Sequence, residues 1–503
     1  MLKRVSLVLT AMLALAVAPA HAGAPLSWTS IQRVSPTGSP YPPGCSGSTT
    51  GNFYPGTEVE PWIATNPADD GNSVAVWQQD RYSNGGANSL RAAYSAGGQW
   101  LDPANQPAFT VCSGGTDPVV NGFERASDPW VTFASDGHVA YFMALAFNQS
   151  RSLESAMTVS RSFRQNGVVG ATWESTPKVL KYDASFNVLN DKNSMTADRF
   201  DPDTAYAIWD RLVFPNERSR GKSFENAAAY YGPTWFTRTT NSGNSWEPAR
   251  KIWDPGQEHH NSGRNDQSIG NQIVQTGSGD LVDIFDWINN DNGGGGKGYK
   301  VAALRSTDHG QTWSNAILVS RFIPGVVSDP TTGDPVRTGD IIPEVAVDPR
   351  AGSNTVYAVW QGASASSRSS VYFSKSTDSG RSWSAPKIVN TVVSTQAFTP
   401  AIRVDKNGRI AINYYDFRDD DATPPLTTDY WSIASTDGGD SWAESHISGP
   451  FDQRSAAVAR GYFLGDYAGL STADNSDVFR AVFGQSTGTA PAHASDIEES
   501  DGH

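Results

Sequence analysis

The chain has 503 residues and a formal net charge of −14 at pH 7. A nucleic acid is therefore not an expected partner, because binding to phosphates needs a basic surface. Aromatic residues make up 11% of the chain, charged residues only 18%, and Gly and Pro are abundant. Short runs of β-forming residues between clusters of Gly, Asn, Asp and Pro predict an all-β protein.

The first 22 residues have the layout of a secretory signal peptide. Lys3 and Arg4 precede an apolar run from Val5 to Ala18, and a small-residue stretch ends at Ala22. Cleavage is expected after Ala22, which would make the mature chain secreted or periplasmic. No later run is apolar for long enough to cross a membrane.

One eight-residue pattern recurs along the chain. It reads STDHGQTW at 306–313, STDSGRSW at 376–383 and STDGGDSW at 435–442, with a variant, TTNSGNSW, at 239–246. Asp and Gly suit a tight turn, because the Asp side chain binds nearby amides and Gly tolerates positive φ. We expect these octets to be structural turns whose final Trp packs between sheets, and not catalytic elements.

The tryptophans of the octets and of two degenerate relatives divide the chain into units of roughly 60 to 75 residues. They are Trp100, Trp173, Trp246, Trp313, Trp383 and Trp442. Inner strands are expected at 61–67, 129–134, 193–198, 271–276, 343–349 and 400–405, and second strands at 73–81, 139–147, 204–211, 281–289, 355–362 and 409–418. With one strand before and one after each octet, every unit has four strands, which is typical of a β-propeller.

A seventh unit begins near Asp466 but ends without a tryptophan. Residues 26–35 have the shape of the missing outer strand, so the N-terminus is expected to complete the last blade and leave no long unpaired edge. We predict a propeller of seven four-stranded blades over residues 23–488, with six blades as the alternative. The acidic end, residues 489–503, is predicted to be disordered.

The octets match the Ser/Thr-x-Asp-x-Gly-x-x-Trp pattern of the Asp-box. Their repetition over nearly the whole mature chain resembles the sialidase (neuraminidase) superfamily of BNR-repeat propellers. The resemblance implies a propeller and an exo-acting glycoside hydrolase that removes terminal sugars, acidic sugars included, from a glycan or glycoconjugate. Asp-box proteins also include lyases and non-enzymes, so a polysaccharide lyase and a non-catalytic glycan-binding or surface protein are the alternatives.

Propeller geometry brings the ends of the second strands to one mouth of the central channel, where ligands usually bind. Arg81, Arg211 and Arg418 stand at three such ends. Three converging guanidiniums suit a carboxylate, and the resemblance implies that the substrate carboxylate is held by three arginines. The alternative is that each arginine pairs with a neighbouring Asp and joins adjacent blades.

The starts of the inner strands bring acids to the same mouth. Sialidases use a Tyr nucleophile assisted by Glu, with a separate Asp as the acid/base. The resemblance therefore implies Tyr467 with Glu344 as the nucleophile pair and Asp128 as the acid. Glu60 is a rival for either carboxylate role, and Asp466 is expected to contact the substrate.

The sequence departs from the family at the first inner strand. Sialidases have an Arg-Ile-Pro motif where this chain reads Glu60-Pro61-Trp62-Ile63. An acid in place of the arginine favours a neutral sugar or a uronic acid over sialic acid. Trp62 is expected to stack on the sugar.

No cofactor is expected to be required, and no metal site is assigned. Cys45 and Cys112, the only cysteines, are candidates for one disulfide in an oxidising compartment. Loops 289–296 and 416–423 are rich in oxygen ligands and are candidates for structural calcium, with plain surface turns as the alternative. The vicinal pair at 259–260, His259 and His260, could serve a lyase as a base or a metal ligand, with a solvated loop as the alternative. The sequence carries no indication of the oligomeric state.

Overall fold

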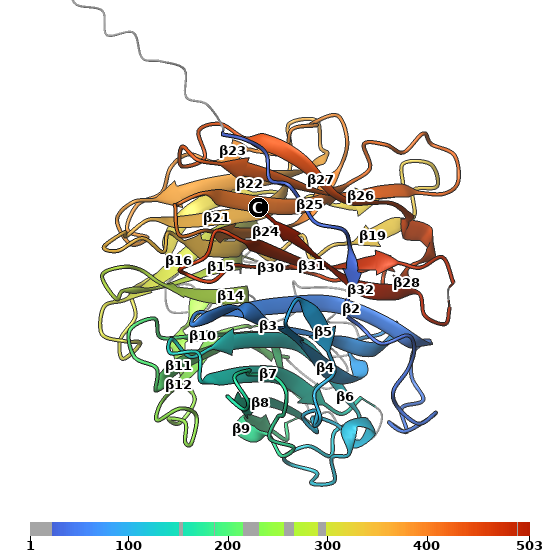
Figure 1. The fold of residues 1–503 in the computed structure, drawn as a ribbon, viewed down its shortest axis with the longest axis vertical. Helices are drawn as coiled ribbons and strands as arrows, with labels where there is room; N and C mark the ends of the chain where they lie inside the picture. Colours follow the sequence, from blue (N-terminus) through green and yellow to red (C-terminus); the bar gives the residue numbers. More distant parts are fainter. Residues whose placement is uncertain are drawn as a thin grey trace, which may run out of the picture.

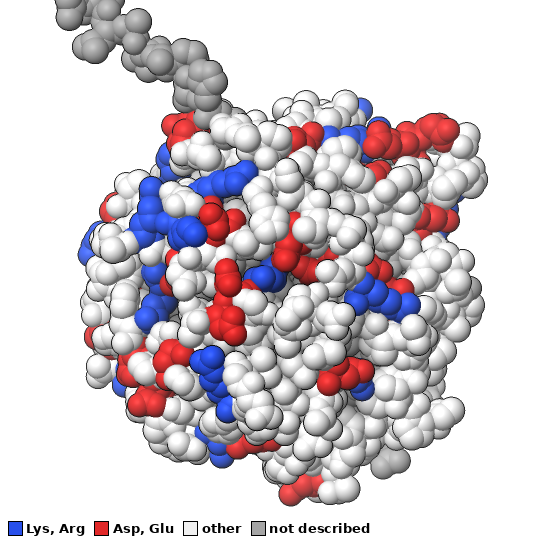
Figure 2. Space-filling model, in the orientation of Figure 1, with Lys and Arg blue, Asp and Glu red and all other residues white. Residues whose placement is uncertain are grey.

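The structure is a computed structural model that describes residues 23–149, 154–185, 187–214, 231–255, 266–289, 298–489 and 491–503. Over these residues the chain is all β, as predicted, with two short 3-10 helices, η1 (Val111–Ser113) and η3 (Gln453–Ser455). No helix in this part of the chain is both long enough and apolar enough to span a membrane. On the face drawn in Figure 2, Lys and Arg side chains are interspersed with Asp and Glu.

The strands form successive antiparallel four-stranded units. The first two units are β2 (Phe53–Asn66), β3 (Asp69–Tyr82), β4 (Ala87–Ala96), β5 (Gln99–Leu101), and β6 (Arg125–Phe133), β7 (Val139–Phe147), β8 (Ser155–Phe163), β9 (Lys178–Asp183). One pairing between β4 and β6 joins them into a single sheet. The next two units are β10 (Val188–Ala197), β11 (Thr204–Val213), β12 (Thr234–Thr240), β13 (Arg250–Trp253), and β14 (Gln267–Gln275), β15 (Leu281–Asn289), β16 (Gly298–Ser306), β17 (Ile317–Phe322).

Three further units complete this series. They are β20 (Glu344–Val347), β21 (Val356–Ala363), β22 (Ser369–Ser376), β23 (Lys387–Ile388); β24 (Ala397–Val404), β25 (Ile410–Asp416), β26 (Thr427–Ser435), β27 (Ala443–Asp452); and β30 (Gly469–Ser471), β31 (Phe479–Ser486), β32 (Ser495–Gly502), β1 (Gln32–Arg33). The first strand of each unit contacts the first strand of the next, and β30 contacts β2. Figure 1 shows the units following one another around the molecule in this order. Apart from the first two units, which share one sheet, each unit forms a sheet of its own, and the sheets do not close on one another. The seven-bladed propeller, with six blades as its alternative, therefore stays a prediction.

The last unit contains both ends of the chain. β1 pairs with β32 through Gln32 and Glu499, so the N-terminal segment supplies the outer strand of this sheet, as expected. The prediction that residues 489–503 are disordered is wrong, because β32 lies between β31 and β1. Ile497 is fully buried there. The acidic composition of the segment hid a strand whose backbone is paired on both sides.

The octets are structural turns, as predicted. In the octet 376–383, Ser376 Oγ donates to Asp378 Oδ1 at 2.8 Å and accepts from the Gly380 amide at 2.8 Å. Burial raises the pKa of Asp378, but the hydrogen bonds from Ser382 and Ser376 together outweigh burial and lower the pKa to about 2. The same bonds recur in the octets 306–313 and 435–442, so the Ser and Asp side chains of the three full octets are held within their own turns.

Two insertions between units form a small extra sheet, which we call the clasp. Its strands are β18 (Val327–Ser328), β19 (Pro335–Arg337), β28 (Ala457–Val458) and β29 (Tyr462–Phe463). β19 and β29 pair in parallel, which joins segments far apart in the sequence. Arg454 Nε donates to Asp329 Oδ2 at 2.6 Å and holds the two insertions together.

Cys45 and Cys112 form a disulfide with a Cα–Cα distance of 5.1 Å, which confirms the predicted pairing. The bridge joins the N-terminal segment to η1, between the first and second units.

Candidate functional site

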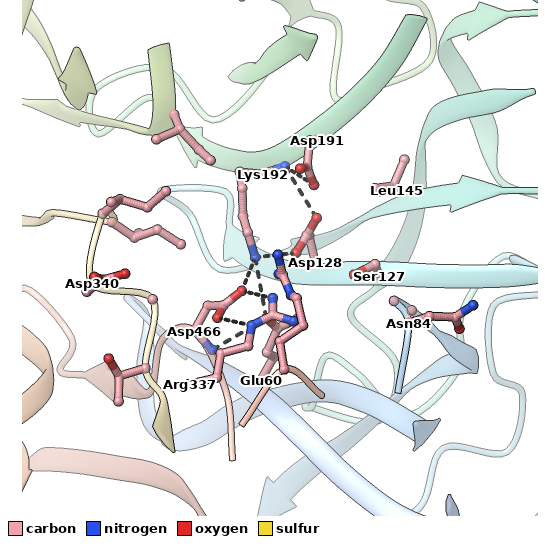
Figure 3. A pocket seen from close by; sticks show the side chains of 18 of the residues that line it. Glu60, Asn84, Ser127, Asp128, Leu145, Asp191, Lys192, Arg337, Asp340 and Asp466 are labelled. Atoms are coloured by element: carbon pink, nitrogen blue, oxygen red, sulfur yellow. Dashed lines mark hydrogen bonds and ion pairs between the residues drawn. The ribbon is translucent and has the colours of Figure 1, made fainter. Parts of the chain in front are cut away.

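A cavity of about 770 Å³ lies at the predicted mouth. Its walls come from the starts of inner strands, the ends of second strands and the clasp. Its charged lining residues are Glu60, Arg81, Asp128, Asp191, Lys192, Arg337, Asp340, Arg460 and Asp466. Figure 3 shows acids and bases from several units facing one another across this pocket.

One backbone feature brings three of these charges into the pocket. Glu60, Asp128 and Lys192 have positive φ angles of 54°, 52° and 43°. Each lies at a register shift in the first strand of its unit, where an extra residue interrupts the pairing. Such a bulge redirects a side chain, and positive φ in a non-glycine residue is a strained state that is common at functional sites. Gly270 takes φ 72° at the corresponding shift in β14.

Lys192 lies at the centre of the charged cluster (Figure 3). Its Nζ donates to Asp466 Oδ2 at 2.8 Å, to Asp128 Oδ1 at 3.0 Å and to Glu60 Oε1 at 3.4 Å. The lysine side chain is 11% exposed, and the three carboxylates are 5% exposed or less. Burial lowers the pKa of Lys192, but the three carboxylates outweigh burial and hold that pKa well above its ordinary value.

Asp466 is bound by two cations. Besides Lys192, Arg337 of the clasp donates to it through Nε at 2.8 Å and through Nη2. Burial raises the pKa of Asp466, but Arg337 and Lys192 outweigh burial and hold the pKa well below its ordinary value. Asp466 is therefore a permanent anion that fixes the clasp to the pocket floor.

Two other carboxyls titrate near neutral pH. Burial raises the pKa of Glu60 to about 7, with Lys192 opposing and the neighbouring acids adding to the rise. Burial and the adjacent Asp128 raise the pKa of Asp191 to about 7. A protonated carboxyl beside ionised ones is the arrangement that separates an acid from a base in a single active site.

Arg81 is the predicted arginine that reaches the pocket. Its side chain is buried, Nη1 donates to Gln78 Oε1 at 2.5 Å, and Nε has no hydrogen-bond partner. The guanidinium lies 4.8 Å from the Phe463 ring centroid, with Arg337 4.4 Å from the same centroid. Burial lowers the pKa of Arg81 to about 10, which still leaves it charged at neutral pH. It makes no ion pair within the described part of the chain.

The predicted cluster of three arginines is wrong. Arg211 donates through Nη2 to Asp183 Oδ1 at 2.6 Å, and Arg418 forms ion pairs with Asp416 and Glu444, both at 2.7 Å. Neither arginine lines the pocket. The alternative holds in full for Arg211, whose partner Asp183 belongs to the neighbouring unit. It holds only in part for Arg418, which pairs with acids of its own unit and joins no adjacent units.

The predicted nucleophile pair, Tyr467 and Glu344, shares no hydrogen bond in the described residues, although Glu344 is among the acids that raise the pKa of Tyr467. Tyr467 is buried against Trp62 and Trp130, and its hydroxyl donates to the Pro129 carbonyl at 3.5 Å. Burial and nearby acids raise the pKa of Tyr467 well above its ordinary value. Glu344 accepts from the side chain of another residue of the channel, Gln272 Nε2, at 3.0 Å and does not line the pocket.

Trp62 does not line the pocket and is not a sugar platform there. Its ring stacks on Trp130 at 3.5 Å, and its side chain is buried. The structure therefore places Glu60, Asp128 and Asp466 where they were predicted. Lys192 lies at the same register position of the third unit, and its ammonium contacts all three carboxylates.

The side chains proposed as ligands for calcium or another metal either bind other groups of the protein or lie outside the described residues. Asp416 binds Arg418, and Asp421 accepts from Thr423, so the loop 416–423 uses its carboxylates internally. His259, His260 and residues 290–296 lie outside the described residues.

Elsewhere, Glu58, His493 and Asp496 place possible ligand atoms within 4.8 Å of one another. Arg33 donates to both His493 Nε2 and Asp496 Oδ1, so its guanidinium already supplies the positive charge in that cluster.

Comparison with known proteins agrees with the octets. Residues 234–459 match the model of the BNR repeat-like domain, which confirms the recognised repeat family over that region. No curated protein matches the sequence.

Solved structures with a similar fold include the Hadza microbial sialidase Hz136, with 16% identity, coverage of 82% of this chain and 72% of that chain, and a TM-score of 0.47. The leech intramolecular trans-sialidase has 10% identity, coverage of 91% and 92%, and a TM-score of 0.45. The α-L-arabinofuranosidase Arb93A from Fusarium graminearum has 11% identity, coverage of 94% and 97%, and a TM-score of 0.44. Likenesses this distant do not identify an activity.

Proposed function

We propose that this chain, whose residues 234–459 form a BNR repeat-like domain, is a glycoside hydrolase that acts on the terminal sugars of glycans or glycoconjugates. The observation that carries the proposal is the pairing of Glu60, whose pKa is raised to about 7 by burial, with the ion-paired carboxylate of Asp128 in one pocket. Glycosidases need a protonated carboxyl and an ionised one on either side of the bond that breaks.

In this mechanism Glu60 donates its proton to the oxygen of the leaving group as the bond to the anomeric carbon breaks. Asp128 accepts a proton from water, whose hydroxide forms the new bond to that carbon. Transfer of that proton back to Glu60 restores both groups. Lys192 forms ion pairs with both carboxylates and holds the two groups in place.

Arg81 supports an anionic group on the sugar. Its guanidinium is buried, charged and without an ion pair in the described residues, and a carboxylate in the pocket would supply the missing partner. Of the three predicted arginines only Arg81 lines the pocket, and Arg337 is already bound to Asp466. Because Glu60 also stands where sialidases have an arginine, a uronic acid is proposed in preference to sialic acid.

We also propose that the chain is exported. The Cys45–Cys112 disulfide supports this, because structural disulfides persist in oxidising compartments. Recovery of the protein from the periplasm or medium with Gly23 as its first residue would agree, and recovery from the cytoplasm with residues 1–22 attached would contradict it.

A second candidate is a non-catalytic glycan-binding protein. Two predicted substrate-binding arginines form ion pairs with acids, and Tyr467 and Glu344 share no hydrogen bond in the described residues. Such a protein would bind glycans equally well after its pocket acids were replaced by amides.

The test is release of terminal sugars from a panel of uronides, sialosides and neutral glycosides. Glu60→Gln is compared with Glu498→Gln, a control acid on the last sheet whose pKa burial also raises to about 7. We expect release by wild type and the control, and a loss of about 10²-fold or more in Glu60→Gln. Binding without release in all three proteins would favour the second candidate.

A further inference from the structure

The pocket has two halves of different chemistry. One half holds the charged cluster around Lys192. The other half is aliphatic and includes Leu145, Leu189, Leu212, Ile269, Val326 and Ile341. Figure 3 shows Leu145 on the side of the pocket away from Arg337 and Asp340.

The aliphatic half, which we call the strip, draws its side chains from several elements. Leu189 of β10 and Leu212 of β11 are direct cross-strand partners. Ile269 precedes Gly270, where an added Cβ would lie 3.0 Å from Ile342 Cγ2, so β14 packs directly against the segment that leads from the clasp. The strip therefore draws on the second, third and fourth units and on the segments beside the clasp.

The strip reaches the surface at the clasp. Val326 is 72% exposed, and its near neighbour Ile323 is 71% exposed. Exposed aliphatic side chains that continue into a pocket mark a surface that a ligand covers, because each buried Å² of apolar area contributes roughly 25 cal/mol.

A second sugar ring does not suit this surface. Among the described lining residues the strip offers no Trp or Tyr ring on which a sugar could stack, and Phe147 is buried. Its aliphatic side chains offer sugar hydroxyls no hydrogen bonds, and burying a hydroxyl without a partner costs about 1–3 kcal/mol. The pocket volume of about 770 Å³ lies in the range for ligands larger than one sugar ring.

We propose that the strip binds an apolar aglycone, an aryl or alkyl group joined to the sugar that the charged half holds. The inference rests on the proposed function and names its substrate class as glycosides of apolar alcohols or phenols. The aglycone leaves as the free alcohol or phenol after its oxygen takes the proton of Glu60.

The test uses the purified full chain and 2-naphthol as a sugar-free probe of the strip, with affinity measured by fluorescence titration. Val326→Asn and Ile341→Asn place a polar side chain on the strip at exposed or half-buried positions, which a folded protein tolerates. Val393→Asn is the control, because Val393 is 55% exposed and does not line the pocket. Thermal unfolding confirms that each variant is folded.

We expect wild type and the control to bind 2-naphthol, and each strip variant to bind it at least about fivefold more weakly. Equal affinity in all four proteins, or no binding by wild type, would overturn the inference. A second measurement compares naphthyl and methyl glycosides of any sugar that the enzyme releases. Equal kcat/KM for both would overturn the strip but leave the hydrolase standing, whereas probe binding without any sugar release would contradict only the hydrolase.

Discussion

Replacement of Lys192 tests whether one ammonium holds the charged cluster together. Lys192→Met leaves Glu60 and Asp128 without their cation in a site where all three side chains are at most 11% exposed. Removal of one partner from a buried ion pair costs about 3–5 kcal/mol. We expect a loss of this size in the free energy of unfolding at pH 8, which a domain with a stability of about 5–15 kcal/mol survives.

The loss should depend on pH in a defined direction. Without the ammonium, the pKa of Glu60 rises further above about 7, so the folded variant binds protons that the unfolded chain releases. Stability of the variant then falls more steeply than that of wild type as pH rises, by about 1.4 kcal/mol for each unit of added pKa shift. At pH 5 Glu60 is protonated in both folded proteins, so the loss there is smaller.

Urea unfolding followed by tryptophan fluorescence at pH 5 and pH 8 measures both effects. The control is Lys181→Met, because Lys181 is 27% exposed and makes only one ion pair in the described residues, a long one with Asp183 at 3.8 Å, besides a cation–π contact with the Trp235 ring at 5.3 Å. The control is expected to lose less than about 1 kcal/mol at both pH values. The reasoning is refuted if Lys192→Met loses no more than the control, or loses the same amount at pH 5 and pH 8.

Three further predictions follow from particular contacts. Glu60→Gln should raise the free energy of unfolding at pH 8 by an amount on the order of 3 kcal/mol and have little effect at pH 4. Burial raises the pKa of Glu60 from 4.5 to about 7, so the folded wild type loses stability as pH rises through that window and Glu60 becomes charged, whereas Gln stays neutral. Urea titrations that show no pH-dependent gain would contradict this prediction. Replacing Cys45 and Cys112 together by Ser should cost about 2–4 kcal/mol, since the bridge closes a loop of 67 residues, and an unchanged melting temperature would contradict the estimate. Ile497→Asp should cost more than about 3 kcal/mol in thermal or urea unfolding, because this side chain is fully buried in β32, whereas a variant as stable as wild type would mean that the tail is dispensable.

Much of the fold could be predicted because its signals are local. Each octet contains the Ser, Asp and Gly that complete its turn, as the hydrogen bonds around Asp378 show. The N-terminal strand could be matched to the last unit by its shape alone. The strand at residues 495–502 could not be predicted, because the acidic composition of this segment indicates only that it is polar. The burial of Ile497 depends on neighbours that other strands supply.

The residues of the candidate site also fall into those that the sequence predicts and those that it does not. Glu60, Asp128 and Asp466 were predictable, because corresponding positions of a repeat are expected to lie at the same face of the molecule, and all three line one pocket. Arg211 and Arg418 were predicted by the same reasoning and fail, because side chains as long as arginine reach whichever carboxylate lies nearest, and sequence spacing does not identify it.

The sequence by itself determined the all-β class, the repeated units, the structural role of the octets and the acids at the mouth, because a repeat turns local spacing into a three-dimensional position. Only the tertiary structure decided which charges meet. Arg337 reaches Asp466 across 129 residues of sequence through the parallel pairing of β19 with β29, and no periodicity signals this contact. The pKa values near 7 of Glu60 and Asp191 likewise arise from burial and from neighbours in other units, which exist only once the chain has folded.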